Sequence, residues 1–424
     1  MQVDQEETPP PNALLLLVRG DGIPLLVRSY GDVCTPPSAA VGVTSALYHA
    51  ATREKNDAAA LQLLSLETKH RSVVYEMTPT DLLLVFASDR TCDGCPSSGV
   101  MVRRMLRTVY DVLLMQIGQR NLRDWDVSKL RAVIAKQVEV VDTIVTKFQI
   151  DPRLVFGRPV RDVVAYRQLD GIDVGRSGSL MQGAWLENGE IVAEYFQTNG
   201  PKILTDKELL LLTVLGECVG RRERNYSHYI GRAHLTRNQT DVKVVIRNSS
   251  KGPLITFIGI FGDKAEDDKV LKELTDKLLL CRAKARVRET GDQLKGLPSS
   301  LICSYASRLG DTPSPSCRML AYLNPSWEAM LKTEVTRLKL PIDSKQVSRN
   351  FWWRELCRFA AHRQYVAASA MVLPPNYKQE DEALTFLQYV RGPIQIVALC
   401  IGPVPVTKIE ALGDTLAEVM LAIQ

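Results

Sequence analysis

The two closely spaced cysteines Cys92 and Cys95 form the pattern that most strongly suggests chemistry. A Cys-x-x-Cys pair can supply half of a zinc site or act as a redox pair. A structural zinc site needs four ligands, and no second pair of cysteines or histidines stands at a matching spacing. A redox pair is expected to open a helix directly after a strand, whereas the turn-forming residues Pro96 to Gly99 follow here. We therefore interpret both cysteines as loop thiols, with ligation shared between subunits and a thiol or metal enzyme as the alternatives.

Other patterns typical of catalysis are absent from the sequence. No glycine-rich phosphate loop stands at a strand-to-helix junction, and no Gly-x-Ser-x-Gly elbow occurs. The five histidines are far apart in the chain, at His49, His70, His228, His234 and His362. An active site needs converging ionisable groups. We therefore predict that the protein is not an enzyme of this kind and that it uses no metal or other cofactor.

Composition is that of an ordinary globular protein with several domains. Hydrophobic residues make up 45% and charged residues 24%, which excludes a largely disordered chain. A chain of 424 residues exceeds one hydrophobic core. The net charge of +5 is small for this length and argues against a nucleic-acid partner. Nine scattered cysteines without a signal peptide predict reduced thiols in the cytoplasm. No apolar run approaches the roughly 18 residues that cross a membrane.

Strands and helices follow one another in an order that recurs along the chain. In the first copy, apolar strands at Ala13–Val18 and Ile23–Arg28 flank turn residues that include Gly20 and Gly22. A helix is expected from Ser38 to Glu54. The three strands expected next are Leu61–Leu66, Ser72–Met77 and Leu82–Ala87.

Two helices with one apolar face each are expected to close the first copy. The apolar face of the first contains Val102, Leu106, Val109, Leu113 and Ile117, and that of the second contains Leu130, Ile134, Val138, Val141 and Val145. This order predicts a five-stranded antiparallel sheet with helices on its faces.

The second copy begins after a connection from Asp151 to Gly178, with the hairpin signal Asn188-Gly189. Its strands are expected at Leu180–Leu186, Ile191–Phe196, Tyr226–Leu235, Asp241–Arg247 and Leu254–Phe261, with helices at Asp206–Cys218 and Glu266–Arg288. Strands of a third copy are expected at Leu301–Ala306, Arg318–Leu323, Tyr365–Val372, Ala383–Tyr389 and Ile394–Leu399, with helices at 327–338 and 345–363 and a final helix that carries Ile409 to Ile423. The fold class is therefore α+β, an α/β sandwich of three tandem domains at residues 13–150, 151–295 and 296–424, after a disordered start at residues 1–12.

The order of two strands, a helix, three strands and closing helices resembles the longin domain. Three longin-like domains in one chain resemble the tri-longin subunits of Rab-type exchange factors. The resemblance is carried by Gly22–Ser29, Val73–Met77, Leu82–Phe86, Met105–Tyr110, Asp126–Val145 and Ser348–Trp352. These are core and turn residues, so they identify a fold and a family rather than an activity. Within the family, the chain is similar to the planar cell polarity effectors.

That resemblance implies a subunit of a planar cell polarity effector complex, paired with the tri-longin protein Inturned and with the propeller protein Fritz. It also implies a role in ciliogenesis, as part of a guanine nucleotide exchange factor for a Rab-type small GTPase. The implied location is the cytoplasm, peripheral at a membrane or the cell cortex and including the ciliary base. The alternative is a vesicle-traffic tether or adaptor of another tri-longin family, without exchange activity.

A platform for the GTPase is implied on the first domain. By position, its candidates are Ala46, Leu47 and Tyr48 on the first helix, with Leu61 and Leu63 on the neighbouring strand. A helix with this much apolar surface is equally consistent with a core helix.

Two basic groups are candidates for contact with anionic phosphoinositide headgroups or with an acidic partner. Arg354, Arg358 and His362 stand four residues apart on one expected helix face, and Arg221 and Arg222 follow the helix of the second copy. Each basic residue near a charged membrane contributes about 1 kcal/mol, so such a group favours docking without anchoring the protein. A solvated helix face is the alternative.

Overall fold

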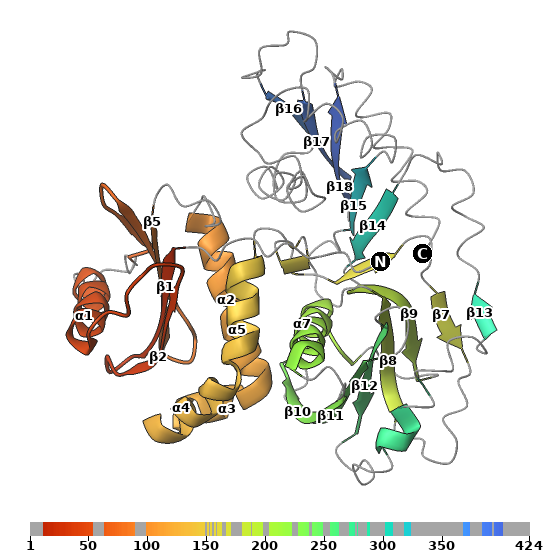
Figure 1. Ribbon diagram of the computed structural model, residues 1–424, viewed down its shortest axis with the longest axis horizontal. Helices are drawn as coiled ribbons and strands as arrows, with labels where there is room; N and C mark the ends of the chain where they lie inside the picture. The colour runs from red at the N-terminus through yellow and green to blue at the C-terminus, as the bar shows by residue number, and fades with distance from the viewer. Residues whose placement is uncertain are drawn as a thin grey trace. The chain divides into compact units, whose positions relative to one another are not determined.

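The computed structural model divides the chain into two compact units, Met1–Gln149 and Ile150–Gln424 (Figure 1). The residues that the structure describes are 12–53, 63–89, 99–148, 151, 153–154, 157, 159–162, 167–170, 180–187, 189–197, 203–222, 228–236, 240–248, 255–262, 271–275, 278, 286–288, 302–307, 318–323, 368–373, 384–391 and 394–401.

The first unit contains a five-stranded sheet in the order β2-β1-β5-β4-β3, with every neighbouring pair antiparallel. Its strands are β1 (Ala13–Arg19), β2 (Pro24–Tyr30), β3 (Ser65–Glu67), β4 (Arg71–Met77) and β5 (Leu82–Asp89). The central strands β1 and β5 are apolar and buried on both faces, as expected for strands that are covered on both sides. The predicted antiparallel sheet is confirmed, although β3 is shorter than the strand expected at Leu61–Leu66.

The β1–β2 hairpin turns where Gly and Asp predicted a turn. Gly22 has a φ of 86°, which glycine adopts without a steric cost. The backbone N–H of Arg19 donates to the carbonyl of Ile23 at 2.9 Å. One residue of β2, Leu25, is left without a partner on β1, so the hairpin contains a bulge next to its turn.

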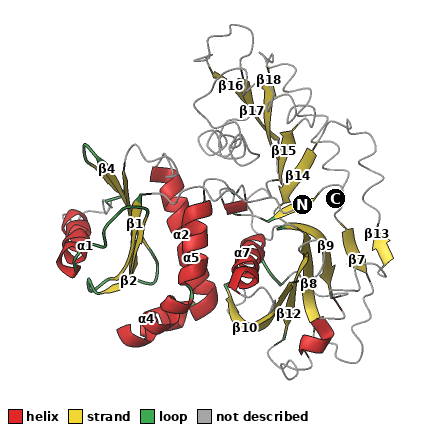
Figure 2. Cartoon of the chain, viewed as in Figure 1, coloured by secondary structure: helices red, strands yellow, loops and turns green. Residues whose placement is uncertain are grey.

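Helices cover both faces of this sheet (Figure 2). On one face, Val41 and Tyr48 of α1 (Ser38–Arg53) pack in a core cluster with Leu14 and Leu16 of β1. The helices that follow β5 are α2 (Gly99–Ile117), α3 (Gln119–Asp124), α4 (Val127–Lys136) and α5 (Val138–Lys147). All five positions predicted on the apolar face of α2 are at most 4% exposed, so this prediction is confirmed.

The single helix expected from Leu130 to Val145 is wrong, because the chain breaks it at Gln137. The N–H of Gln137 donates to the carbonyl of Ile134, three residues back, which tightens the end of α4. A new helix then begins at Val138. Apolar residues continue at helical spacing on both sides of the break, which is why the periodicity alone did not reveal it.

A polar contact joins β2 to α5 across the second face. The hydroxyl of Tyr30 donates to Asp142 Oδ1 at 2.9 Å, and Arg28 Nε donates to the same oxygen at 3.1 Å. Burial raises the pKa of Tyr30 above its ordinary value, and the Asp142 carboxylate raises that pKa further.

We expect Tyr30→Phe to lower the free energy of unfolding by about 1–2 kcal/mol, because the hydrogen bond to a carboxylate is lost. Above about pH 10, the unfolded chain releases the Tyr30 proton while the folded chain retains it, so wild-type stability falls by up to about 1.4 kcal/mol per pH unit from this group. The variant lacks this contribution. Urea unfolding of the first unit, followed from neutral to alkaline pH with a probe placed in that unit, tests this, and equal slopes for wild type and variant would contradict it.

The second unit repeats the strand order of the first. Its strands β8 (Leu180–Glu187), β9 (Glu190–Phe196), β10 (His228–Leu235), β11 (Thr240–Asn248) and β12 (Ile255–Phe261) pair antiparallel in the order β10-β11-β12-β8-β9. Helix α7 (Asp206–Arg222) follows β9, as α1 follows β2. The β8–β9 hairpin also has its bulge next to the turn, where Val192 is without a partner. The chain therefore contains two copies of one α+β architecture.

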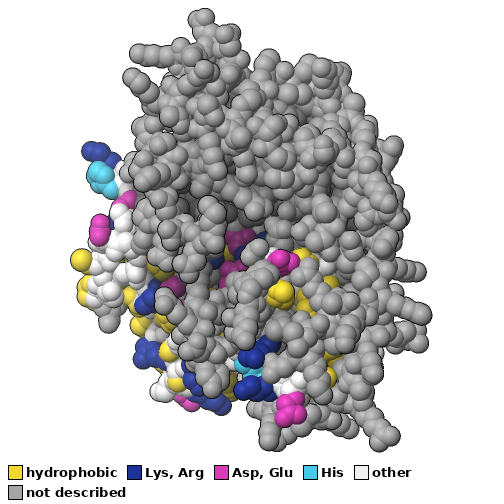
Figure 3. Space-filling model, turned by 45° about the vertical axis from the view of Figure 1, so that its right-hand side comes forward, with side chains coloured by type: hydrophobic (Ala, Val, Ile, Leu, Met, Phe, Trp, Pro, Cys, Tyr) yellow, Lys and Arg dark blue, Asp and Glu magenta, His cyan; other side chains and the backbone are white. Residues whose placement is uncertain are grey.

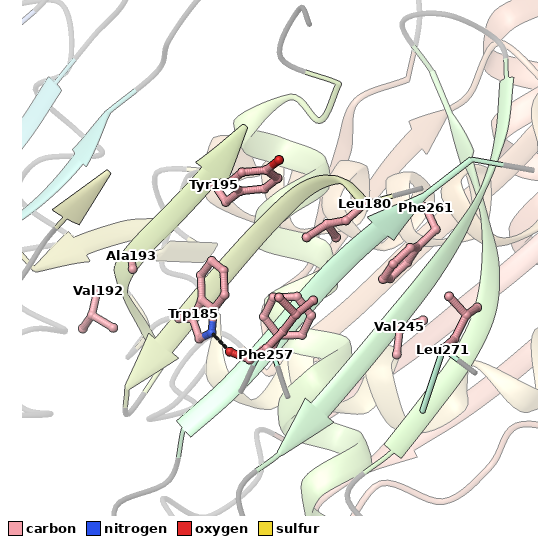
Figure 4. Close-up of a cluster of buried hydrophobic side chains, with 10 residues drawn as sticks. Leu180, Trp185, Val192, Ala193, Tyr195, Val245, Phe257, Phe261 and Leu271 are labelled. Atoms are coloured by element: carbon pink, nitrogen blue, oxygen red, sulfur yellow. Dashed lines mark hydrogen bonds between the residues drawn. The ribbon is translucent and has the colours of Figure 1, made fainter. Parts of the chain in front are cut away.

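An aromatic core fills one face of the second sheet (Figure 4). The rings of Trp185 on β8 and Phe257 on β12 lie with their centroids 4.8 Å apart, and both side chains are fully buried. Leu271 and Leu278, from a helical stretch after β12, belong to the same cluster. Trp185 Nε1 donates to the carbonyl of Leu278 at 3.0 Å, so the ring also ties this helical stretch to the sheet.

Two expectations for the second unit are wrong. The connection before β8 contains two short strands, β6 (Val160–Asp162) and β7 (Arg167–Asp170), which pair with β9 in the parallel direction. The helix expected to run to Arg288 ends earlier, because Arg286–Arg288 form strand β13, which pairs with β7. Pairing with distant strands overrides local helix preference here, and local patterns cannot reveal such pairing.

Five further strands lie where the third copy was expected. They are β14 (Ile302–Ser307), β15 (Arg318–Leu323), β16 (Ala368–Leu373), β17 (Leu384–Arg391) and β18 (Ile394–Ile401). Their order is β14-β15-β18-β17-β16, and β15 pairs with β18 in parallel, whereas β1 pairs with β5 antiparallel. The helices expected at 327–338, 345–363 and 409–423 lie outside the described residues, so a third copy stays a prediction.

Candidate functional site

Helix α1 is unusual because it carries almost no charge. Its sequence contains no Asp, Glu or Lys, and its one Arg is its last residue. A helix at the surface of a globular protein normally turns a polar face to water. The side of α1 that faces away from the sheet therefore needs an explanation.

The inner side of α1 packs on the sheet. Val41 and Tyr48 are 1% and 4% exposed. Burial raises the pKa of Tyr48, and the nearby Glu76 carboxylate adds to this. Two buried polar atoms on the helix, Ser45 Oγ and His49 Nε2, have no hydrogen-bond partner among the described residues.

The outer side of α1 is an exposed apolar surface. Val43 and Leu47, one turn apart, are 59% and 48% exposed. The other exposed residues between Ala39 and Ala51 are all small. They are Ala39, Ala40, Gly42, Ala46, Ala50 and Ala51. We call the outward surface formed by Ala39, Ala40, Val43, Ala46, Leu47, Ala50 and Ala51 the α1 face.

Two leucines at β3 are also exposed on the same side of the sheet. Leu64 and Leu66 are 43% and 41% exposed. Leu66 lies opposite Val73, and the carbonyl of Leu64 accepts from the N–H of Tyr75. Val73 and Tyr75 pack in the cluster beneath α1, so the side chains of Leu64 and Leu66 lie on the α1 side. Of the five exposed large hydrophobic residues in the described chain, four thus lie on this side.

Such a concentration of exposed apolar side chains is typical of a surface that another protein covers. The adjoining β3–β4 turn carries the exposed basic residues Lys69, His70 and Arg71, with Glu67 before it. The α1 side of the sheet therefore carries exposed apolar side chains on α1 and beside β3, with basic residues in the β3–β4 turn. The side chains of the α1 face cannot donate or accept a proton. The face is therefore suited to docking another protein rather than to acid–base chemistry.

The structure divides the residues predicted for the GTPase platform. Ala46 and Leu47 lie on the α1 face. Tyr48 does not, because its ring is buried against Tyr75, with the ring centroids 5.8 Å apart. Leu63 is half-buried and packs against the core, and Leu61 lies outside the described residues. The prediction missed Val43, which the run of uncharged residues from Ser38 to Thr52 could have indicated, and Leu64 and Leu66, which only the pairing of β3 with β4 places on this side.

The predicted basic contacts are mostly beyond the described chain. Arg221 and Arg222 end helix α7, but their side chains are not described. Arg354, Arg358 and His362 lie outside the described residues, as do Cys92 and Cys95. On the face drawn in Figure 3, described Lys and Arg side chains stand among acidic and hydrophobic ones. His228 and His234 both lie on β10 as expected, and His234 Nδ1 is 3.0 Å from Asp241 Oδ1.

The described part of the chain contains neither a cluster of metal ligands nor a membrane-crossing helix. No three His, Cys, Asp or Glu residues are grouped there in a way that could hold a metal ion. None of the helices in these segments is both long and apolar enough to cross a membrane.

The two repeats have the strand order and helix placement expected of longin-like domains. No model of a known protein family matches the sequence, and no curated protein matches it.

Proposed function

We propose that the protein is a non-catalytic subunit of an exchange complex for a Rab-type small GTPase, and that the α1 face is part of the surface that receives the GTPase. The observation that carries this proposal is the exposure of Val43 and Leu47 on a helix with almost no charge, with Leu64 and Leu66 exposed on the same side of the sheet. Because each of these four side chains is only 41–59% exposed, covering it completely in an interface would contribute about 1 kcal/mol.

Exchange by such a surface needs no catalytic base. A protein that binds the nucleotide-free GTPase more tightly than the nucleotide-bound form shifts the population towards nucleotide release. The switch segments of a GTPase become ordered or disordered with the nucleotide, so a docking surface that holds them in one arrangement changes nucleotide affinity. The apolar α1 face suits the apolar part of a switch segment, and the basic β3–β4 turn on the same side of the sheet suits acidic residues of the GTPase.

Further parts of the proposal come from the resemblance to tri-longin planar cell polarity effectors. They are a partnership with Inturned and Fritz, a role in ciliogenesis, and peripheral contact with anionic phosphoinositide membranes. Strands β14 to β18 are proposed to belong to a third longin-like domain with an altered hairpin position.

The direct test is release of labelled GDP from a panel of Rab-type GTPases in the presence of the full chain co-purified with its partners. We expect faster release from one or a few panel members. Leu47→Asp places a charge in the apolar surface and is expected to reduce the acceleration at least about 10-fold, which corresponds to about 1.4 kcal/mol of lost interaction.

Ile23→Asp is the matched control, because Ile23 is 36% exposed but lies in the β1–β2 turn, outside the α1 face. We expect this variant to behave as wild type. No acceleration across the panel would reject the exchange function. Equal loss of the acceleration in both variants would reject the α1 face as the site of exchange. Recovery of coat or vacuolar-fusion components without Inturned would favour the alternative function of a vesicle-traffic tether or adaptor.

A further inference from the structure

The outer edge of β2 can be compared with an equivalent edge in the same chain. Bulges at Leu25 and Val192 align the two hairpins, so that Leu26, Val27 and Arg28 of β2 correspond to Ala193, Glu194 and Tyr195 of β9. Both strands follow the first strand of their copy, and both lie next to it at the same end of the five-strand order.

The equivalent edge of β9 is occupied. Strand β7 lies beside β9 (Figure 1) and pairs with it in parallel, with Arg167, Gln168 and Leu169 opposite Ala193, Glu194 and Tyr195. Strand β6 pairs with the start of β9, also in parallel, at Ile191. In the first unit, no described strand lies beyond β2.

The two edges of the first sheet differ in how they are protected. Strand β3 has only three residues, all exposed, and leads into a basic turn. Short length and charged residues commonly prevent another strand from pairing with a free edge. Strand β2 has seven residues, and its middle is apolar at Leu25, Leu26 and Val27. Its one charged side chain, Arg28, is engaged by Asp142. Pro24 has no N–H, and its carbonyl accepts from Arg131 at 2.6 Å and 2.9 Å, so the unprotected stretch begins at Leu25.

We propose that the edge of β2 from Leu25 to Ser29 receives an extended segment of a partner protein, which runs parallel to β2 as β7 runs parallel to β9. This site is separate from the α1 face. Main-chain hydrogen bonds supply most of the affinity in such strand addition, and alternate side chains supply the specificity. The segment takes apolar side chains on the side of Val27, which packs in the core cluster under α1, and polar ones on the side of Arg28 and Asp142.

In the second unit the occupant of the edge, β7, comes from the same chain, whereas the described part of the chain supplies no such segment beside β2, and parallel addition argues against a second copy. A parallel neighbour cannot be joined to β2 by a tight turn and needs a crossover of about a dozen residues or more. The described chain leaves β2 through a hairpin at one end and a loop into α1 at the other. Two β2 strands related by a twofold axis perpendicular to their sheets would run antiparallel.

Hydrogen exchange tests the site in the full chain, alone and in the assembly co-purified from cells without added GTPase. In the assembly, we expect those amides of residues 25–29 that point away from β1 to exchange at least about 10-fold more slowly than in the chain alone, while the outward amides of Ser65–Glu67 on β3 stay unchanged. Equal exchange of the outward β2 amides in both samples would overturn the proposal. Protection of these outward amides already present in the chain alone would also overturn it, because the chain itself would then cover the edge.

Photo-crosslinkers placed singly at the partly exposed residues Leu26 and Ser29 test the direction in cells and need no isolated chain. The segment reached from Ser29 must lie C-terminal to the segment reached from Leu26 in the same partner. The reverse order would overturn parallel addition, as would crosslinks to a second copy of this chain. Ser29→Lys should lower retention of that partner at least about 10-fold, and Ser65→Lys on the other edge should not. Nucleotide release through the α1 face is measured separately, so either proposal can fail alone.

Discussion

Arg153→Met is expected to lower the free energy of unfolding of the second unit by about 3–5 kcal/mol, since it leaves buried carboxylates without their cation. The guanidinium group donates to both oxygens of Asp151, at 2.6–3.1 Å, and to Glu217 Oε1 at 2.6 Å. Its Nη1 donates to the carbonyl of Gly189 at 2.8 Å. Burial alone would lower the pKa of Arg153, but the two carboxylates outweigh it and raise the pKa above the ordinary value.

This arginine therefore holds together three parts of the second unit: the start of its chain, the β8–β9 turn and helix α7. The turn is built around the arginine, because a Cβ on Gly189 would lie 2.5 Å from Arg153 Nη1, and Gly189 has a φ of 83°. Leu154, beside the arginine, is fully buried.

The measurement is hydrogen exchange of β8 and β9 amides in the full chain, because a two-unit protein does not give one unfolding free energy. The control is Arg120→Met. Arg120 pairs with Asp124 four residues on, but its side chain is 92% exposed, so we expect a change below about 0.5 kcal/mol. A similar small change for Arg153→Met would contradict the proposed role of this cluster.

Trp185→Ala is expected to destabilise the same unit by about 3–5 kcal/mol, because it leaves a large cavity in a close-packed core. The indole is fully buried, packs against Phe257 and binds the carbonyl of Leu278. Its removal takes away both the packing beneath the helical stretch at residues 271–278 and the one hydrogen bond that Trp185 makes with it. We therefore expect this stretch to lose protection from exchange before the sheet does.

Trp185→Phe separates the two contributions. It keeps an aromatic ring near Phe257 but loses the hydrogen bond to Leu278, so we expect about half the destabilisation of the alanine variant or less. Exchange at residues 271–278 and at β12 reports each part. Equal protection of residues 271–278 in wild type and Trp185→Ala would show that the tryptophan does not hold this stretch.

Local patterns were enough to predict most strands of the first two copies. Alternation and glycine-containing turns predicted β1, β2, β8 and β9, and helical spacing predicted the buried face of α2. The elements that were missed depend on distant contacts. β6, β7 and β13 exist because they pair with one another and with β9, and neither their length nor their composition distinguishes them from loop.

The candidate site was partly predictable for the same reason. The lack of charge in α1 was visible, but it did not show which of its apolar residues face the sheet. Assigning Tyr48 to the docking surface was wrong because the tyrosine side chain reaches inward to Tyr75, whereas Leu47 turns outward. Leu64 and Leu66 become part of the surface only through the pairing of β3 with β4.

A protein that works by docking should be recovered with stoichiometric partners, and losing the α1 face should remove one of them. The measurement is purification of the tagged full chain from cells, followed by identification and counting of the bound proteins. With wild type we expect a second longin-type subunit, a propeller protein and a small GTPase. The GTPase should be lost from Leu47→Asp and kept by Ile23→Asp. Recovery of wild type as a monodisperse monomer, or of Leu47→Asp with the complete set of partners, would contradict docking through the α1 face.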